Sequence, residues 1–104
     1  MRFEEIQKNI ELIDAHFHEQ FKNKSEYERL LSRTVKLNEE VGELCEAVLH
    51  EGKEQRQEKT GIDFNGEVAD VIICTLMLAQ MKNVSVWDEV GKKLEKIKSR
   101  FTIE

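Results

Sequence analysis

The sequence predicts an all-α protein, a four-helix antiparallel bundle module that assembles into a homo-oligomer. Apolar residues recur at spacings of three and four along most of the chain, which is the period of an amphipathic helix. The chain has no proline and is 36% charged and 39% hydrophobic, as expected for helices with apolar stripes and solvated outer faces. No segment shows a competing strand pattern.

The first half of the chain predicts two helices. Apolar residues at helical spacing place the first helix within residues 3–24. Ser25 is followed three residues later by Glu28, the capping-box pattern that begins a helix. We expect this second helix to run for roughly seven turns, as far as Gly52.

The second half predicts a connection and two further helices. Residues 51–64 are charged and bounded by glycines, which indicates a loop. Its basic side chains could close over a ligand as a lid or could simply be solvated; they are Lys53, Arg56 and Lys59. A helix over about 66–82 follows, and we expect it to be the most buried one because its middle is apolar on every side. The last helix is predicted over 86–101.

Length and composition restrict the organisation and the partners. The 104 residues fit one domain, 1–104. Only 7% of them are aromatic, so the core is thin and we expect some apolar faces to be buried between subunits. A net charge of −5 argues against nucleic acid as the main partner. The run from Val68 to Met81 contains polar residues and is short for a bilayer, so we expect no membrane partner.

Two further features favour a cytoplasmic protein. The N-terminus has no apolar run after its basic residue, so we expect no signal peptide. Cys45 and Cys74 fall on helical apolar patterns without a metal-type spacing, and we expect both to be reduced core thiols.

Two pairs of acids stand beside the most apolar segments. Glu40 and Glu43 flank the apolar stripe of the second helix, and Glu67 and Asp70 open the third helix. A spacing of three residues puts the two carboxylates of each pair on one helix face. Like charges crowded beside apolar surface resist ionisation unless a cation neutralises them. The pattern therefore predicts a cation site.

An all-carboxylate donor set suits hard cations such as Mg²⁺ or Mn²⁺ better than zinc. Mg²⁺ held in this way keeps positions open for water and phosphate oxygens, so a phosphate ester or anhydride is the natural substrate. The acids could instead lie on solvated helix faces. The chain would then be a non-catalytic helical module that oligomerises or senses a nucleotide or metal, and the residues alone leave this alternative open.

The spacing of these acids resembles a known family signature. Glu39-Glu40-x-x-Glu43, followed after 23 residues by Glu67-x-x-Asp70, is similar to the motif of the MazG-like, all-α nucleoside triphosphate pyrophosphohydrolases. Flanking residues that also look like this family are Gly42, Leu44, Ala47, Val71 and Ile72.

The resemblance covers about residues 27–101. It implies a four-helix module that forms homodimers or homotetramers, the latter as dimers of dimers. The implied activity is hydrolysis of an NTP or dNTP to the monophosphate and pyrophosphate, as in cleansing of the nucleotide pool. The implied cofactor is Mg²⁺, with Mn²⁺ as a substitute.

The resemblance also implies roles for single residues. Glu40, Glu43, Glu67 and Asp70 would be the metal ligands, and Glu40 would thereby take part in catalysis. Glu39 matches the first acid of the motif and would help to position a second metal or the water that attacks the α-phosphorus.

In the last helix, the resemblance implies that basic residues bind the substrate, namely Lys93, Lys96 and Arg100. Ile97 stands about where family members often have an asparagine. This departure leaves the sugar and base preference open.

Overall fold

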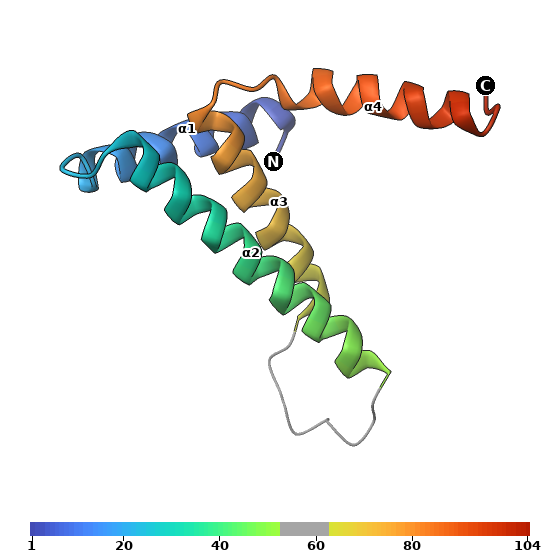
Figure 1. The fold of residues 1–104 in the computed structure, drawn as a ribbon, viewed down its shortest axis with the longest axis horizontal. Coiled ribbons are helices and arrows are strands. Elements are labelled where there is room, and N and C mark those ends of the chain that lie inside the picture. The colour runs from blue at the N-terminus through green and yellow to red at the C-terminus, as the bar shows by residue number, and fades with distance from the viewer. Residues whose placement is uncertain (53–62) are drawn as a thin grey trace.

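The computed structural model describes residues 1–52 and 63–104, which form four helices. They are α1 (Phe3–Gln20), α2 (Glu26–Glu51), α3 (Phe64–Met81) and α4 (Val86–Arg100) (Figure 1). No strand occurs in these described ranges. The predicted all-α class and its four helices are therefore confirmed.

Two helix boundaries differ from the predicted ones. α1 ends at Gln20 instead of near residue 24, because residues 21–24 turn toward α2. α3 begins at Phe64, earlier than the predicted residue 66, with Asp63 at its N-cap position. The additional residues lengthen α3 on the side of its two acids.

Local hydrogen bonds explain where α2 begins. The Glu28 amide donates to Ser25 Oγ (3.1 Å), and the Ser25 amide donates to the Glu28 carboxylate (3.0 Å). These bonds form the predicted capping box, and they lower the pKa of Glu28. At the start of α4, in contrast, the Ser85 hydroxyl donates to the Asp88 carboxylate (2.7 Å) and caps no backbone amide.

The helices pack unequally. α2 and α3 lie antiparallel along most of their lengths, and α1 crosses the C-terminal part of α3 (Figure 1). A small core between α1 and α3 contains Ile10, Leu76 and Met77, with Ile6 and Val86 packed against it. The α2–α3 pair is therefore the main body of the chain, and α1 braces one end of it.

Arg33 connects this body to α1. Its Nη1 atom lies 2.7 Å from Asp14 Oδ1 on α1 and donates to the Met77 carbonyl on α3 (2.9 Å). The side chain is only 14% exposed, so water replaces these partners poorly. One arginine on α2 thus holds three helices together.

α3 is less buried than the sequence predicts. Leu76 and Met77 are buried, but Ile72 and Ile73 are nearly half exposed (48% and 44%). The helix is apolar around its circumference, yet one chain covers only part of it. By length and composition alone, α3 could cross a membrane, although we expected its apolar run to be too short. The core helices of soluble proteins pass the same test, so this property is weak evidence for a membrane span.

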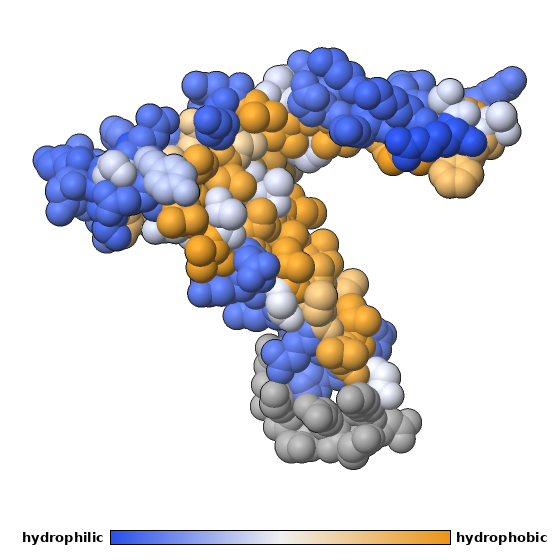
Figure 2. Space-filling view, in the orientation of Figure 1, coloured by the Kyte–Doolittle hydropathy of each residue, from blue (hydrophilic) through white to orange (hydrophobic). Residues whose placement is uncertain are grey.

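α4 extends away from the other three helices (Figure 1). The radius of gyration is 17.0 Å, compared with about 13 Å for a compact domain of this length. Apolar surface runs along α3 and continues beneath α4 (Figure 2). The exposed apolar residues of α4 are Val90, Leu94, Ile97 and Phe101. One chain therefore leaves faces uncovered that the predicted oligomer would bury.

The two cysteines occupy different surroundings. Both are free thiols, but Cys45 is exposed and only Cys74 is partly buried. The expectation of a core position is wrong for Cys45 within one chain, because none of the described residues covers its side of α2.

Replacing Arg33 should destabilise the fold. We expect Arg33→Met to lower the free energy of unfolding by about 1–3 kcal/mol, because the Met77 carbonyl and the Asp14 carboxylate lose their partner. Urea unfolding at fixed protein concentration measures this change. Lys22→Met is the control, since it removes an exposed ion pair with Glu19 and should change stability by less than about 0.5 kcal/mol. Equal effects of the two variants would contradict the assigned role of Arg33.

Candidate metal centre

Three of the predicted acids meet where α2 packs against α3. Glu40 comes from the middle of α2, and Glu67 and Asp70 come from the first two turns of α3. One carboxylate oxygen from each residue lies within 4.8 Å of the others, a grouping that could hold a metal ion. The antiparallel pairing of the two helices thus brings the predicted acid pairs together. We call these three residues the acidic cluster.

The acidic cluster is partly removed from water. Glu40 is only 6% exposed, which is unusual for a carboxylate, and Glu67 is half-buried. Glu40 Oε2 and Glu67 Oε2 are buried and have no hydrogen-bond partner among the described residues. Buried polar atoms left without partners are costly, and two anionic oxygens in one place are more so. Both oxygens fit a hard cation, which accepts carboxylate ligands.

Glu43 lies beside the acidic cluster and outside its group of three. The negative charge of Glu40, and next that of Glu67, raises the pKa of the Glu43 carboxyl. This shift shows that Glu43 faces the same concentration of negative charge although it is exposed. Protons therefore compete with a cation for this carboxylate at a higher pH than they would at an isolated glutamate.

Lys36 is the cation that the described residues place against the acidic cluster. Its Nζ atom lies 3.2 Å from Glu40 Oε1 and 3.7 Å from Glu39 Oε2. Glu39 is exposed and pairs with this ammonium, so the structure does not bring it into the cluster. Sequence reasoning missed Lys36. The signal was its position four residues before Glu40, where a lysine and a glutamate meet on one helix face.

Cys74 lies close enough to the acidic cluster for its carboxylates to affect the pKa of the thiol. Partial burial raises the pKa of its thiol first, and the negative charges of Glu40 and Asp70 raise it further. Nearby Lys36 opposes this effect. Among the described residues, the group that could hold a metal ion consists of carboxylates and includes no cysteine, so its donor set is all oxygen and favours Mg²⁺ or Mn²⁺ over zinc.

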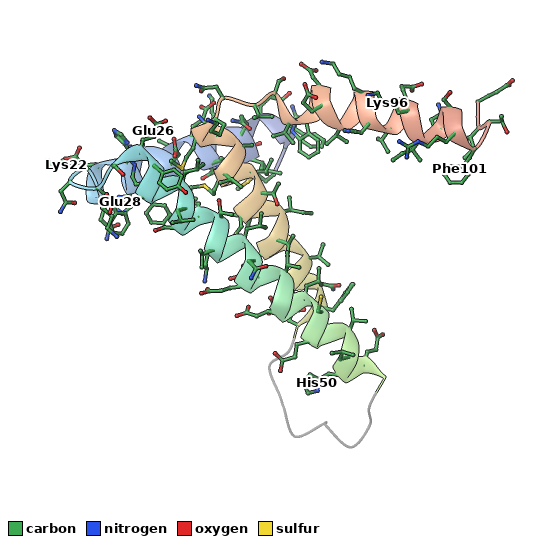
Figure 3. All side chains as sticks on the ribbon, in the orientation of Figure 1. Lys22, Glu26, Glu28, His50, Lys96 and Phe101 are labelled. Atoms are coloured by element: carbon green, nitrogen blue, oxygen red, sulfur yellow. The ribbon has the colours of Figure 1, made fainter. Side chains whose placement is uncertain are left out.

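The basic residues predicted to bind substrate are not near the acids of their own chain. Lys93, Lys96 and Arg100 belong to α4, which leaves α3 at the end opposite Glu67 and Asp70; Lys96 is labelled in Figure 3. Lys93 lines a groove with Thr75 and Ala79 of α3. The basic residues of the 51–64 loop, which could form a lid or be solvated, lie outside the described part of the chain; they are Lys53, Arg56 and Lys59.

A comparison with protein families shows which family the chain belongs to. The family model of the MazG nucleotide pyrophosphohydrolase domain matches residues 28–102, most of the chain. The chain belongs to this family. The match begins in the first turn of α2 and includes α3 and α4, whereas α1 lies outside it. No curated protein and no solved structure matches the chain.

Membership of the MazG family confirms the resemblance seen in the sequence and indicates nucleotide pyrophosphohydrolase chemistry. The acidic cluster lies within the matched residues and could bind the metal that this chemistry uses. The matched residues include both helices that contribute the acidic cluster.

Metal binding should stabilise the chain through the acidic cluster. With Mg²⁺ at about 100 times its Kd, the wild-type protein should gain about 2.7 kcal/mol and show a higher melting temperature. Glu67→Gln should lose most of this gain, because an uncharged amide binds Mg²⁺ weakly. Thermal unfolding with and without Mg²⁺ measures both effects.

The matched control is Glu95→Gln, which neutralises an exposed glutamate of α4 that pairs with Lys98. It should respond to Mg²⁺ as the wild type does. A Glu67→Gln variant that still shows the full Mg²⁺ response would show that the ion binds elsewhere.

Proposed function

We propose that this chain is an Mg²⁺-dependent nucleotide pyrophosphohydrolase that cleaves an NTP or dNTP to the monophosphate and pyrophosphate. The observation that carries this proposal is the acidic cluster, with its two buried and unpartnered carboxylate oxygens, inside a MazG domain. Mn²⁺ would substitute for Mg²⁺, because both ions accept oxygen ligands. Removal of unwanted nucleotides from the cytoplasmic pool is the role that such a reaction would serve.

Four acids would bind the metal ion in this proposal. Glu40, Glu67 and Asp70 would hold the ion, and Glu43 would complete the set from the exposed side. A bound Mg²⁺ would neutralise the negative charge of the phosphate chain and polarise it for attack. Burial of Glu40 between the helices fixes the direction of its carboxylate before any ligand arrives.

Glu39 would act on the attacking water molecule. Its carboxylate is exposed next to Glu40 and is held only by a weak contact with Lys36 (3.7 Å). From there it could orient a water molecule and accept its proton. The water oxygen bonds to the α-phosphorus, and the bond from this phosphorus to the oxygen bridging to the β-phosphorus breaks. The products are the nucleoside monophosphate and pyrophosphate.

A second copy of the chain would complete the site. Lys93, Lys96 and Arg100 lie on a helix that projects away from its own acids, and the apolar stripe of that helix is exposed. The apolar surface of α3 is also uncovered, which offers a partner's α4 a place to pack (Figure 2). In a homodimer, or a tetramer made of two dimers, α4 of one subunit would bring its basic residues to the phosphates held by the other.

Activity should depend on the acidic cluster. Glu40→Gln and Asp70→Asn should each lower kcat by a factor of about 10² or more, because each removes a charged ligand of the ion. Pyrophosphate release from a panel of ribo- and deoxynucleoside triphosphates with Mg²⁺ measures this loss and ranks the substrates. Glu95→Gln should retain wild-type turnover.

Two results would contradict the proposed function. Steady turnover by Glu40→Gln or Asp70→Asn would remove the acids from the reaction. A correctly folded wild-type oligomer that releases pyrophosphate from no member of the panel would favour a non-catalytic module that binds a nucleotide or metal.

A site shared between subunits can be tested by mixing inactive chains. One chain carries Asp70→Asn, and the other carries glutamine at the three basic positions of α4. In a statistical mixture, half of the dimers contain one chain of each kind, and each mixed dimer has one intact site. We therefore expect recovery of about a quarter of wild-type activity. If each chain used its own α4, no mixed dimer would contain an intact site, and no activity would return.

A further inference from the structure

Lys36 stands at a boundary between opposite charges on α2. Arg29 and Arg33 precede it at helical spacing, and Glu40 and Glu43 follow it at the same spacing. These five residues lie along one side of the helix, because residues three and four apart are neighbours on a helix surface. This side is basic in its N-terminal half and acidic in its C-terminal half.

In the chain without ligands, Lys36 acts as the counterion of the acidic cluster. Its ammonium lies 3.2 Å from Glu40 Oε1 and 3.7 Å from Glu39 Oε2. It satisfies one oxygen of Glu40, and Glu40 Oε2 and Glu67 Oε2 have no hydrogen-bond partner within residues 1–52 and 63–104.

This contact is easily exchanged. The Lys36 side chain is 59% exposed although its partner Glu40 is buried, so water can solvate the ammonium when it leaves the carboxylate. A divalent cation interacts with several carboxylates of the cluster at once and carries twice the charge. It should therefore displace the ammonium from Glu40.

A displaced Lys36 would stay beside the site. The same side chain lines a pocket between α1 and α2, together with Phe17, Phe21, Lys24, Arg29, Ser32 and Arg33. Arg33 is fixed by Asp14 and the Met77 carbonyl, whereas the ion-pair partners of Lys36 among the described residues are Glu39 and Glu40 alone. Its ammonium can consequently turn within its own length from Glu40 to an anion that approaches the cluster.

We propose that Lys36 is a positioning residue that exchanges partners, neutralising Glu40 in the metal-free chain and contacting the substrate's phosphate chain once a divalent cation occupies the acidic cluster. The second half of this exchange rests on the proposed function. The first half depends only on the acids and the cation. Lys36 would thus reduce the repulsion among the carboxylates of the metal-free acidic cluster. Once the metal ion is bound, it would place a positive charge beside the phosphates of the substrate.

Isothermal titration of Lys36→Gln with Mn²⁺ alone, and then with inorganic tripolyphosphate in excess Mg²⁺, tests both halves. We expect Mn²⁺ to bind about three- to tenfold more tightly than to wild type, because the competing ammonium is gone. Tripolyphosphate should bind about tenfold more weakly, because a charge-assisted contact is lost. A role for Lys36 in merely supporting the fold would not move the two affinities in opposite directions.

Two variants complete the experiment. Lys36→Arg keeps the charge and should stay near wild type for Mn²⁺. Lys92→Gln removes a similarly exposed lysine that pairs with Glu89 on α4, and should leave both affinities unchanged. Unchanged or weaker Mn²⁺ binding by Lys36→Gln overturns the exchange at Glu40. Tripolyphosphate binding that is absent in wild type, or equal in wild type and Lys36→Gln, overturns the contact with phosphate. Failure of the proposed function would appear instead as absent pyrophosphate release, with the Mn²⁺ result still readable.

Discussion

Negative charge crowded between α2 and α3 is the constraint on which the rest of the structure depends. Helix pairs are normally held together by apolar contacts, yet this one encloses the carboxylate of Glu40 and brings Glu67 and Asp70 against it. Such an interface is costly without a cation, because like charges repel and two carboxylate oxygens lack hydrogen-bond partners in the part of the chain that the structure describes. A bound cation would remove this repulsion and supply partners for the two oxygens. Cation binding should therefore also stabilise the fold.

Of the two remaining helices, α1 supports the α2–α3 pair and α4 extends away from it. α1 braces the C-terminal end of α3 through a small apolar core and through Arg33, whereas Glu67 and Asp70 lie at the N-terminal end of α3. α4 contributes no cover to the acidic cluster and instead projects with an exposed apolar stripe. In our proposal the chain is therefore half of a functional unit, with acids and basic residues that meet only between subunits.

The sequence predicted the acidic cluster because its geometry follows from local rules. A spacing of three residues fixes which helix face the acids occupy, and the apolar stripes beside Glu40 and Glu67 determine that these faces pack together. The capping box at Ser25 was equally local and was confirmed. The acids also carried the resemblance to the MazG family, which the family match confirmed.

Features that depend on distant parts of the chain could not be predicted in the same way. The direction of α4 and the exposure of Ile72 depend on which surfaces cover each other, and a periodic pattern only shows that a face is apolar. The expected burial of Cys45 was wrong for the same reason. The contact between Lys36 and Glu40 is also local in sequence. It was overlooked because a lysine near glutamates usually forms only a weak surface ion pair.

Anomalous diffraction from crystals of the wild-type chain soaked in Mn²⁺ would test the central claim most directly, because it locates the ion without reference to activity. We expect a strong peak between α2 and α3 within coordination distance, about 2.2 Å, of carboxylate oxygens from Glu40, Glu67 and Asp70. A fully soaked crystal with no peak there, or with its only peak at other residues, would contradict the account.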